Sequence, residues 1–278
     1  MDEGSREVLL TYVKLNLPHL VARTFGNSRP FLLVSIVGEQ GVGKSTYAYY
    51  SVKVGLMAYL CRAHGVNLFK EPERCAAYLE GNYGEICLTR ECGPDQLDKT
   101  YELDVYTGPR GLDGVFAAAA TLARLGQKKK VLFLDDVLAR TAYHLGPKYR
   151  AAYAALRELI RLARTVGAVV VMTAPTKEYL PPEAPKEGEF VVGHFGPSER
   201  RFVRMHAASY ADKDGYVRRR LVVKYVDVVP AKAAFGMPKW LEEEIIKRKR
   251  KAIIDIAKLG RGAFYELYDE EAFHLEKL

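Results

Sequence analysis

Three short apolar runs stand out in the pattern of hydrophobic and polar positions: residues 31–37, 131–134 and 168–172. Each run is nearly continuous and rich in β-branched side chains, which is typical of a strand buried on both faces of a sheet. Helical spacing of apolar residues follows over 44–63 and 149–165. Alternating strands and helices predict an α/β fold, in which a mostly parallel sheet is sandwiched by helices.

Further helices are expected where apolar residues recur at helical spacing. They cover residues 5–25, where Pro18 interrupts the pattern, and residues 72–80, 112–126 and 238–257. Residues 85–90 and 100–106 read as two strands around a turn at 93–95.

The pattern changes after the proline-rich stretch at 181–185. Strand-like segments follow at 190–192, 202–206 and 216–229, with a turn at 212–215. They predict a small antiparallel unit or an extension of the sheet, followed by a strongly charged helix. We therefore divide the chain into a core at 1–180 and a β-rich extension with a basic C-terminal helix at 181–278, packed on the core.

Length and composition are those of an ordinary globular protein: 278 residues, of which 49% are hydrophobic and 27% charged. No signal peptide is visible, and no stretch reaches the roughly 20 apolar residues of a membrane span, so we expect no span and a cytoplasmic location. The four cysteines form no C-x-x-C pair. Buried thiols are favoured over a metal site, with a Cys87–Cys92 disulfide as the alternative.

A glycine-rich motif directly follows the first apolar run and opens the helix at 44–63. Its sequence matches G-x-x-x-x-G-K-[ST] at every fixed position and consists of Gly38, Glu39, Gln40, Gly41, Val42, Gly43, Lys44 and Ser45. The glycines let backbone N–H groups turn inward around phosphates, and the helix N-terminus adds a partial positive charge. The sequence therefore predicts a nucleoside triphosphate site, with ATP as the ligand.

Each polar residue of this motif has an expected role. Lys44 supplies a positive charge to the β and γ phosphates, and the Ser45 hydroxyl is a ligand for Mg²⁺. Thr46 adds a hydroxyl near the α phosphate. A glycine-rich turn without a ligand is the alternative interpretation.

Two further strands end in polar residues that suit the same site. The run at 131–134 delivers Asp135 and Asp136, a Walker B pattern in which Asp135 holds Mg²⁺ and Asp136 polarises the attacking water. Thr173 ends the third run and is placed to orient that water or to sense the γ phosphate. The alternatives are a helix N-cap for the aspartates and a loop residue for the threonine.

On these residues the chain resembles P-loop ATPases of the additional-strand class, including AAA+ and RecA-like proteins. The aspartate pair is similar to that of bacterial replication initiators and helicase loaders. The order of elements resembles small ATPases from viruses and plasmids of thermophilic archaea, including a helix that ends at Arg164–Thr165 and a strand that ends in Met172–Thr176. The resemblance covers roughly residues 31–255 and implies ATP hydrolysis associated with DNA. Because about 90 residues separate Lys44 from Asp135, more than is usual in AAA+ cores, the resemblance also implies an insertion near residues 82–108.

The net charge of +8 fits either a polyanionic partner or a solvated basic surface. Its densest segments are Arg218–Arg220 and Lys247–Lys251, for which we weigh contacts to the DNA backbone against simple solvation. An arginine that completes the transition state is sought among Arg140, Arg150, Arg164, Arg200 and Arg201, or in a neighbouring subunit of a homo-oligomer or a partner protein. The tyrosines at 47, 49, 50 and 59 are expected to pack rather than stack on bases.

The leading hypothesis is a Mg-dependent ATPase acting in DNA replication, loading, translocation or packaging. A small-molecule kinase or phosphotransferase is one alternative, and a nucleotide-gated DNA-binding or scaffolding protein with little hydrolysis is another. A GTP-dependent switch is disfavoured, because Thr176–Tyr179 has tyrosine where the guanine-reading aspartate would stand.

Overall fold

A computed structural model describes most of the chain. The described residues are 3–26, 31–83, 103–107, 129–135, 167–181 and 184–234, with the single positions 120, 124, 154, 157, 158, 160, 162, 242, 243, 246, 247, 250, 254 and 257.

The described strands form one seven-stranded sheet of order β2-β3-β4-β1-β5-β6-β7. The strands are β1 (Leu32–Val37), β2 (Leu103–Thr107), β3 (Lys129–Asp135), β4 (Gly167–Ala174), β5 (Glu189–Phe195), β6 (Glu199–Ala211) and β7 (Val217–Pro230). The first five in sheet order pair in parallel, whereas β5 with β6 and β6 with β7 pair antiparallel. The α/β fold with a mostly parallel sheet is thus confirmed.

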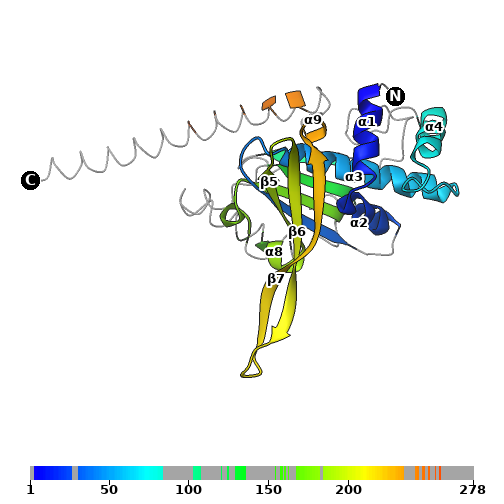
Figure 1. The fold of residues 1–278 in the computed structure, drawn as a ribbon. Helices are drawn as coiled ribbons and strands as arrows, with labels where there is room; N and C mark the ends of the chain where they lie inside the picture. Colours follow the sequence, from blue (N-terminus) through cyan, green and yellow to red (C-terminus); the bar gives the residue numbers. More distant parts are fainter. Residues whose placement is uncertain are drawn as a thin grey trace, which may run out of the picture.

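Helices cover both faces of this sheet. The described ones are α1 (Glu3–Tyr12), α2 (Asn16–Phe25), α3 (Lys44–Ala63), α4 (Pro72–Tyr83), the short 3₁₀ turn η3 (Lys177–Tyr179), α8 (Ala184–Glu187) and α9 (Ala231–Ala234). Figure 1 shows α1 to α4 gathered together beside the sheet, away from α8. The described single positions within the predicted helices at 112–126, 149–165 and 238–257 are also helical.

The alternation of side chains along β1 explains the two layers. Leu32, Val34 and Ile36 face the cluster formed with α1 to α4. Leu33 and Val37 face a second cluster that includes Ala184 of α8. A strand with apolar side chains on both faces must be covered on both, which is why the central runs show no polar alternation.

Several boundaries differ from those predicted. The break in the N-terminal helical segment lies between α1 and α2, and Pro18 sits in the first turn of α2, where its missing N–H has no helical acceptor to lose. Residues 103–107, inside the expected insertion, form β2 and pair with β3. The strand expected at 85–90 and the turn at 93–95 lie outside the described residues.

β5 lies beyond the boundary that we placed at residue 180, yet it pairs in parallel with β1. The sheet therefore runs continuously from the predicted core into the predicted extension. The division of the chain at that point stays a prediction.

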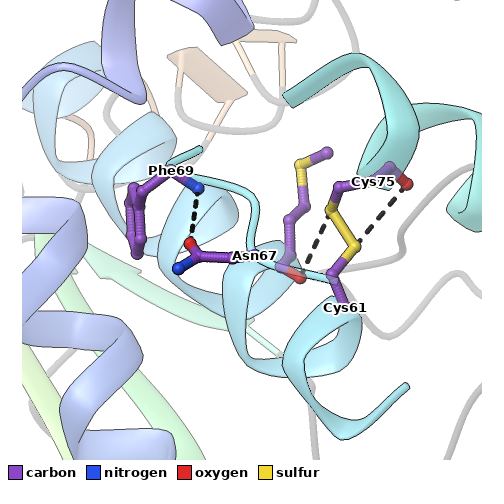
Figure 2. Close-up of a disulfide and its surroundings, with 5 residues drawn as sticks. Cys61, Asn67, Phe69 and Cys75 are labelled. Carbon is purple, nitrogen blue, oxygen red and sulfur yellow. Dashed lines mark hydrogen bonds between the residues drawn. A yellow bond between two sulfur atoms is a disulfide. The ribbon is translucent and has the colours of Figure 1, made fainter. Parts of the chain in front are cut away.

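The expectation of buried thiols was wrong for two cysteines. Cys61 at the end of α3 and Cys75 in α4 are buried, but they form a disulfide with a Cα–Cα distance of 5.7 Å (Figure 2). The chain between α3 and α4 turns back at Gly65. Within this link, Asn67 Oδ1 accepts a hydrogen bond from the Phe69 N–H at 3.1 Å. This turn brings the two helices close enough for a bridge. Cys87 and Cys92 lie outside the described residues.

The β6–β7 hairpin changes character along its length. A register shift between Arg204 and Met205 marks a β-bulge, a feature that bends strands. Beyond it the hairpin projects away from the rest of the chain (Figure 1). We call residues 207–224 the arm and the remaining part of the hairpin, in which β6 also pairs with β5, its base.

No helix among the described residues is long and apolar enough to cross a bilayer.

Candidate functional site

The glycine-rich motif forms the link between β1 and α3. Gly38 has φ of 152°, and a Cβ at this position would lie only 2.7 Å from the Gly193 carbonyl oxygen. Gly43 has φ of 89° in the left-handed region and is the N-cap of α3. Glycine is required at both positions, at the first by close backbone approach and at the second by conformation. The Gly38 N–H donates to the Pro175 carbonyl at 3.1 Å, which ties this loop to the end of β4.

Lys44 is folded back over the loop. Its Nζ donates to the carbonyl oxygens of Gly38 at 2.9 Å and Glu39 at 3.1 Å. The side chain is largely buried, so the ammonium group is held close to the backbone of the loop rather than extended into solvent. A cation in this position is available to a phosphate that enters the loop.

Two hydroxyl groups meet at one carboxylate oxygen. Ser45 Oγ donates to Asp135 Oδ1 at 2.5 Å, and Thr173 Oγ1 donates to the same oxygen at 2.8 Å. Asp135 and Thr173 are fully buried at the ends of β3 and β4. The sheet order β3-β4-β1 explains the meeting, because β4 lies between the aspartate strand and the strand that leads into the loop.

The remaining residues of the motif divide by exposure. Glu39, Gln40 and Gly41 are exposed at the tip of the loop. Val42 is fully buried, and Thr46 is buried in the first turn of α3. Asp136, to which we assigned the attacking water, lies outside the described residues.

This arrangement suits a hard divalent cation next to phosphates. A serine hydroxyl and an aspartate carboxylate are oxygen ligands of the kind that Mg²⁺ takes together with water and phosphate oxygens. Lys44 and the N-terminus of α3 would supply positive charge to phosphates bound in the loop. The residues present therefore fit the implied Mg²⁺.

A buried polar network lies directly behind the loop. The Tyr47 hydroxyl donates to Asp227 Oδ2 at 2.7 Å, and the Tyr47 ring stacks on Phe202 at a centroid distance of 3.9 Å. Asp227 Oδ1 also accepts from the backbone and side-chain nitrogens of Asn16, both at 2.7 Å, and Oδ2 accepts from the Leu17 N–H at 3.1 Å. One carboxylate of β7 thus caps α2 and anchors α3.

This network was missed from the sequence, although a lone aspartate in an apolar strand (YVDVV, residues 225–229) was a usable signal. Burial raises the pKa of the Tyr47 phenol well above its usual value of 10, and Asp227 raises it further. The expectation that Tyr47, Tyr49 and Tyr50 pack in the core is confirmed, because all three are buried.

The first basic segment lies on the arm. Arg218 and Arg220 are exposed on the arm, where Arg218 pairs with Asp212 at 2.6 Å and Arg220 lies over the Tyr210 ring at 5.2 Å. In the segment 247–251, the described positions 247 and 250 are helical and exposed. Among the candidate arginines, those at 140, 150 and 164 lie outside the described residues. Arg200 and Arg201 begin β6.

No protein-family model matches the chain, and no curated protein is similar to it. One solved structure that resembles it is a KaiC-like protein, PH0186, from the hyperthermophilic archaeon Pyrococcus horikoshii OT3. It is 14% identical, the match covers 69% of this chain and 88% of that chain, and the TM-score is 0.27. A similarity at this level does not decide function, which rests on the geometry of the site.

Proposed function

We propose that this chain is a Mg-dependent ATPase of the additional-strand class of P-loop proteins. The observation that carries the proposal is the meeting of Ser45, Asp135 and Thr173 beside the loop that holds Lys44. A serine from the loop, an aspartate at the end of β3 and a polar residue from β4, the strand between β3 and β1, are the parts needed to hold the metal and the γ phosphate.

In this proposal the loop backbone and the Lys44 ammonium bind the β and γ phosphates. Ser45 and Asp135 hold the Mg²⁺, which when bound neutralises charge on the phosphate oxygens. Thr173 positions the water that attacks the γ phosphate, and Asp136 accepts its proton. Because Asp is shorter than the glutamate common at that position, we expect slow turnover.

The test is release of labelled phosphate from γ-labelled ATP, with and without Mg²⁺. Lys44→Ala should lower the rate by about 100-fold or more, the scale of losing one preorganised charge. Lys70→Ala removes an exposed lysine from the link between α3 and α4, outside the glycine-rich loop, and should leave the rate unchanged. Label that appears only on a second molecule would favour the kinase alternative, and no Mg-dependent release by the wild type would overturn the enzyme.

We further propose that the arm contacts nucleic acid. Its basic residues are Lys213, Arg218, Arg219, Arg220 and Lys224, and its acidic residues are Asp212 and Asp214. Exposed Tyr210 and Tyr216 lie among them. Cations interleaved with aromatic rings suit a phosphate backbone with unstacked bases beside it, which favours single strands without base readout.

Fluorescence anisotropy with labelled single- and double-stranded DNA at several salt concentrations tests the arm. Arg218→Ala/Arg220→Ala should weaken binding about tenfold and reduce the slope of log K against log salt by roughly two. Arg62→Ala/Arg74→Ala removes two exposed arginines of α3 and α4 and is the matched control. Equal DNA affinity of the two variants would show that the arm does not contact DNA. Stimulation of ATP hydrolysis by DNA would tie it to the loop.

A further inference from the structure

The strand order gives the phosphate loop two unlike sides. On one side of β1 lie β4 and β3, which carry Thr173 and Asp135. On the other side lies β5. If the γ phosphate and Mg²⁺ occupy the side of Asp135, as in the proposed function on which this inference rests, the nucleoside must leave the loop at its other end.

The end of β5 is in contact with that other side. A Cβ built on Gly193 would lie 3.1 Å from the Val42 side chain, and the Gly193 carbonyl approaches Gly38 closely. Two residues further on, the Phe195 ring reaches the tip of the loop, with Cζ 4.0 Å from a Cβ built on Gly41. An aromatic ring therefore borders the loop where the nucleoside would emerge.

Phe195 is exposed but held in place. Its side chain is 49% exposed, and it belongs to neither core cluster of the described residues. The Arg200 guanidinium lies over the ring, with Cζ 4.8 Å from its centroid. Arg200 Nη1 in turn donates to the carbonyls of Gly196 at 3.2 Å and Glu199 at 3.0 Å. The turn between β5 and β6 thus fixes the arginine, and the arginine supports the ring.

We propose that Phe195 stacks on the base of the bound nucleotide, with Arg200 as the positioning residue behind the ring. A fixed, half-exposed ring loses little freedom on stacking, and every base presents a flat face to it. Purines overlap a ring more than pyrimidines do. The site should therefore prefer purine over pyrimidine triphosphates without distinguishing adenine from guanine.

The experiment compares Mg-ATP, Mg-CTP and Mg-tripolyphosphate, the last of which has the phosphates but no base, by isothermal titration calorimetry. Phe195→Ala should lower the affinity for ATP by about tenfold and leave the affinity for tripolyphosphate unchanged. Phe195→Trp should retain ATP binding. Tyr225→Ala removes a ring that is 45% exposed and also lies against an arginine, Arg204, and it should change neither affinity. Lys44→Ala should weaken both ligands.

Two results would overturn the inference while sparing the proposed function: equal ATP affinity in the wild type and Phe195→Ala, or an equal loss for ATP and tripolyphosphate. The second would mean that the ring shapes the loop instead of touching a base. Absence of binding of either ligand to the wild type would overturn the proposed function and this inference with it.

Discussion

The sheet contains two regions that differ in how far their side chains are buried. In its parallel half, β1, β3 and β4 are covered on both faces, and their side chains are buried almost without exception. In the arm, β6 and β7 pair only with each other among the described strands, and Tyr216 and Val217 are 70% and 76% exposed. Full burial fixes the end of each parallel strand, so hydroxyls and a carboxylate can meet within hydrogen-bond distance. Incomplete burial leaves side chains available to a partner.

The two regions meet at the base of the hairpin. There Phe202 packs on Tyr47, and Asp227 receives hydrogen bonds from α2 and α3. Tyr47 follows Lys44 by less than one turn of α3. The helix that begins at the glycine-rich loop therefore contacts the base of the hairpin directly.

The strongest test of the contrast between the two regions replaces Asp135 by Asn, which keeps the shape of the side chain but removes its charge. We expect Mg-dependent phosphate release to fall by about 1,000-fold, or about 4 kcal/mol of transition-state stabilisation, because the metal loses its anionic ligand. Asp214→Asn, an exposed aspartate of the arm, should leave turnover unchanged. Full activity in the Asp135 variant would place the chemistry elsewhere.

The next largest effect is expected where the two regions join. Asp227→Ala removes the acceptor of four donors in a buried site and should lower the free energy of unfolding by about 3–4 kcal/mol. Tyr47→Phe, which removes one of these hydrogen bonds and keeps the ring, should cost about 1 kcal/mol. Urea unfolding measures both. Asp214→Ala at the exposed turn should stay within about 0.5 kcal/mol, and a similar loss there would erase the contrast between base and arm.

The disulfide belongs to the helical layer that covers the parallel half. Replacing Cys61 and Cys75 by Ala should lower the free energy of unfolding by about 3 kcal/mol, the value for a closed loop of this length, and leave nucleic-acid binding by the arm unchanged. A reducing agent should destabilise the wild type similarly and the double variant not at all. Equal stability of the two proteins would show that the cysteines do not bridge.

The contrast also explains what could be predicted from the sequence. Buried parallel strands leave a direct trace as apolar runs, so β1, β3 and β4 and the residues that end them follow from the pattern alone. The motif Gly38–Ser45 predicts its own local geometry, because its glycines and its position between strand and helix leave few alternatives. The candidate site residues on these elements can therefore be named from the order of amino acids.

Contacts between distant segments produce no comparable pattern in the sequence. Cys61 and Cys75 became partners only because a turn at Gly65 folds α4 back on α3, and spacing alone does not reveal that. Phe195 reaches the loop because β5 pairs with β1 in parallel, whereas its sequence placed it in a separate extension. Strand pairing, and not local propensity, brings Phe195 to the loop. The turn at Gly65 brings the two cysteines together.

The smallest effect we predict concerns Tyr12 of α1, a tyrosine of the buried helical layer. Its hydroxyl is buried and has no hydrogen-bond partner within the part of the chain that the structure describes, so Tyr12→Phe should be as stable as the wild type or up to about 1 kcal/mol more stable at pH 7. Burial raises the pKa of the Tyr12 phenol well above 10, and Tyr50 and Asp227 raise it further. The native state thus keeps a proton that the unfolded chain releases, and stability is lost as pH rises above 10. The advantage of Tyr12→Phe in urea unfolding should therefore grow above pH 10, whereas a variant that is less stable at pH 7 would mean that the hydroxyl has a partner.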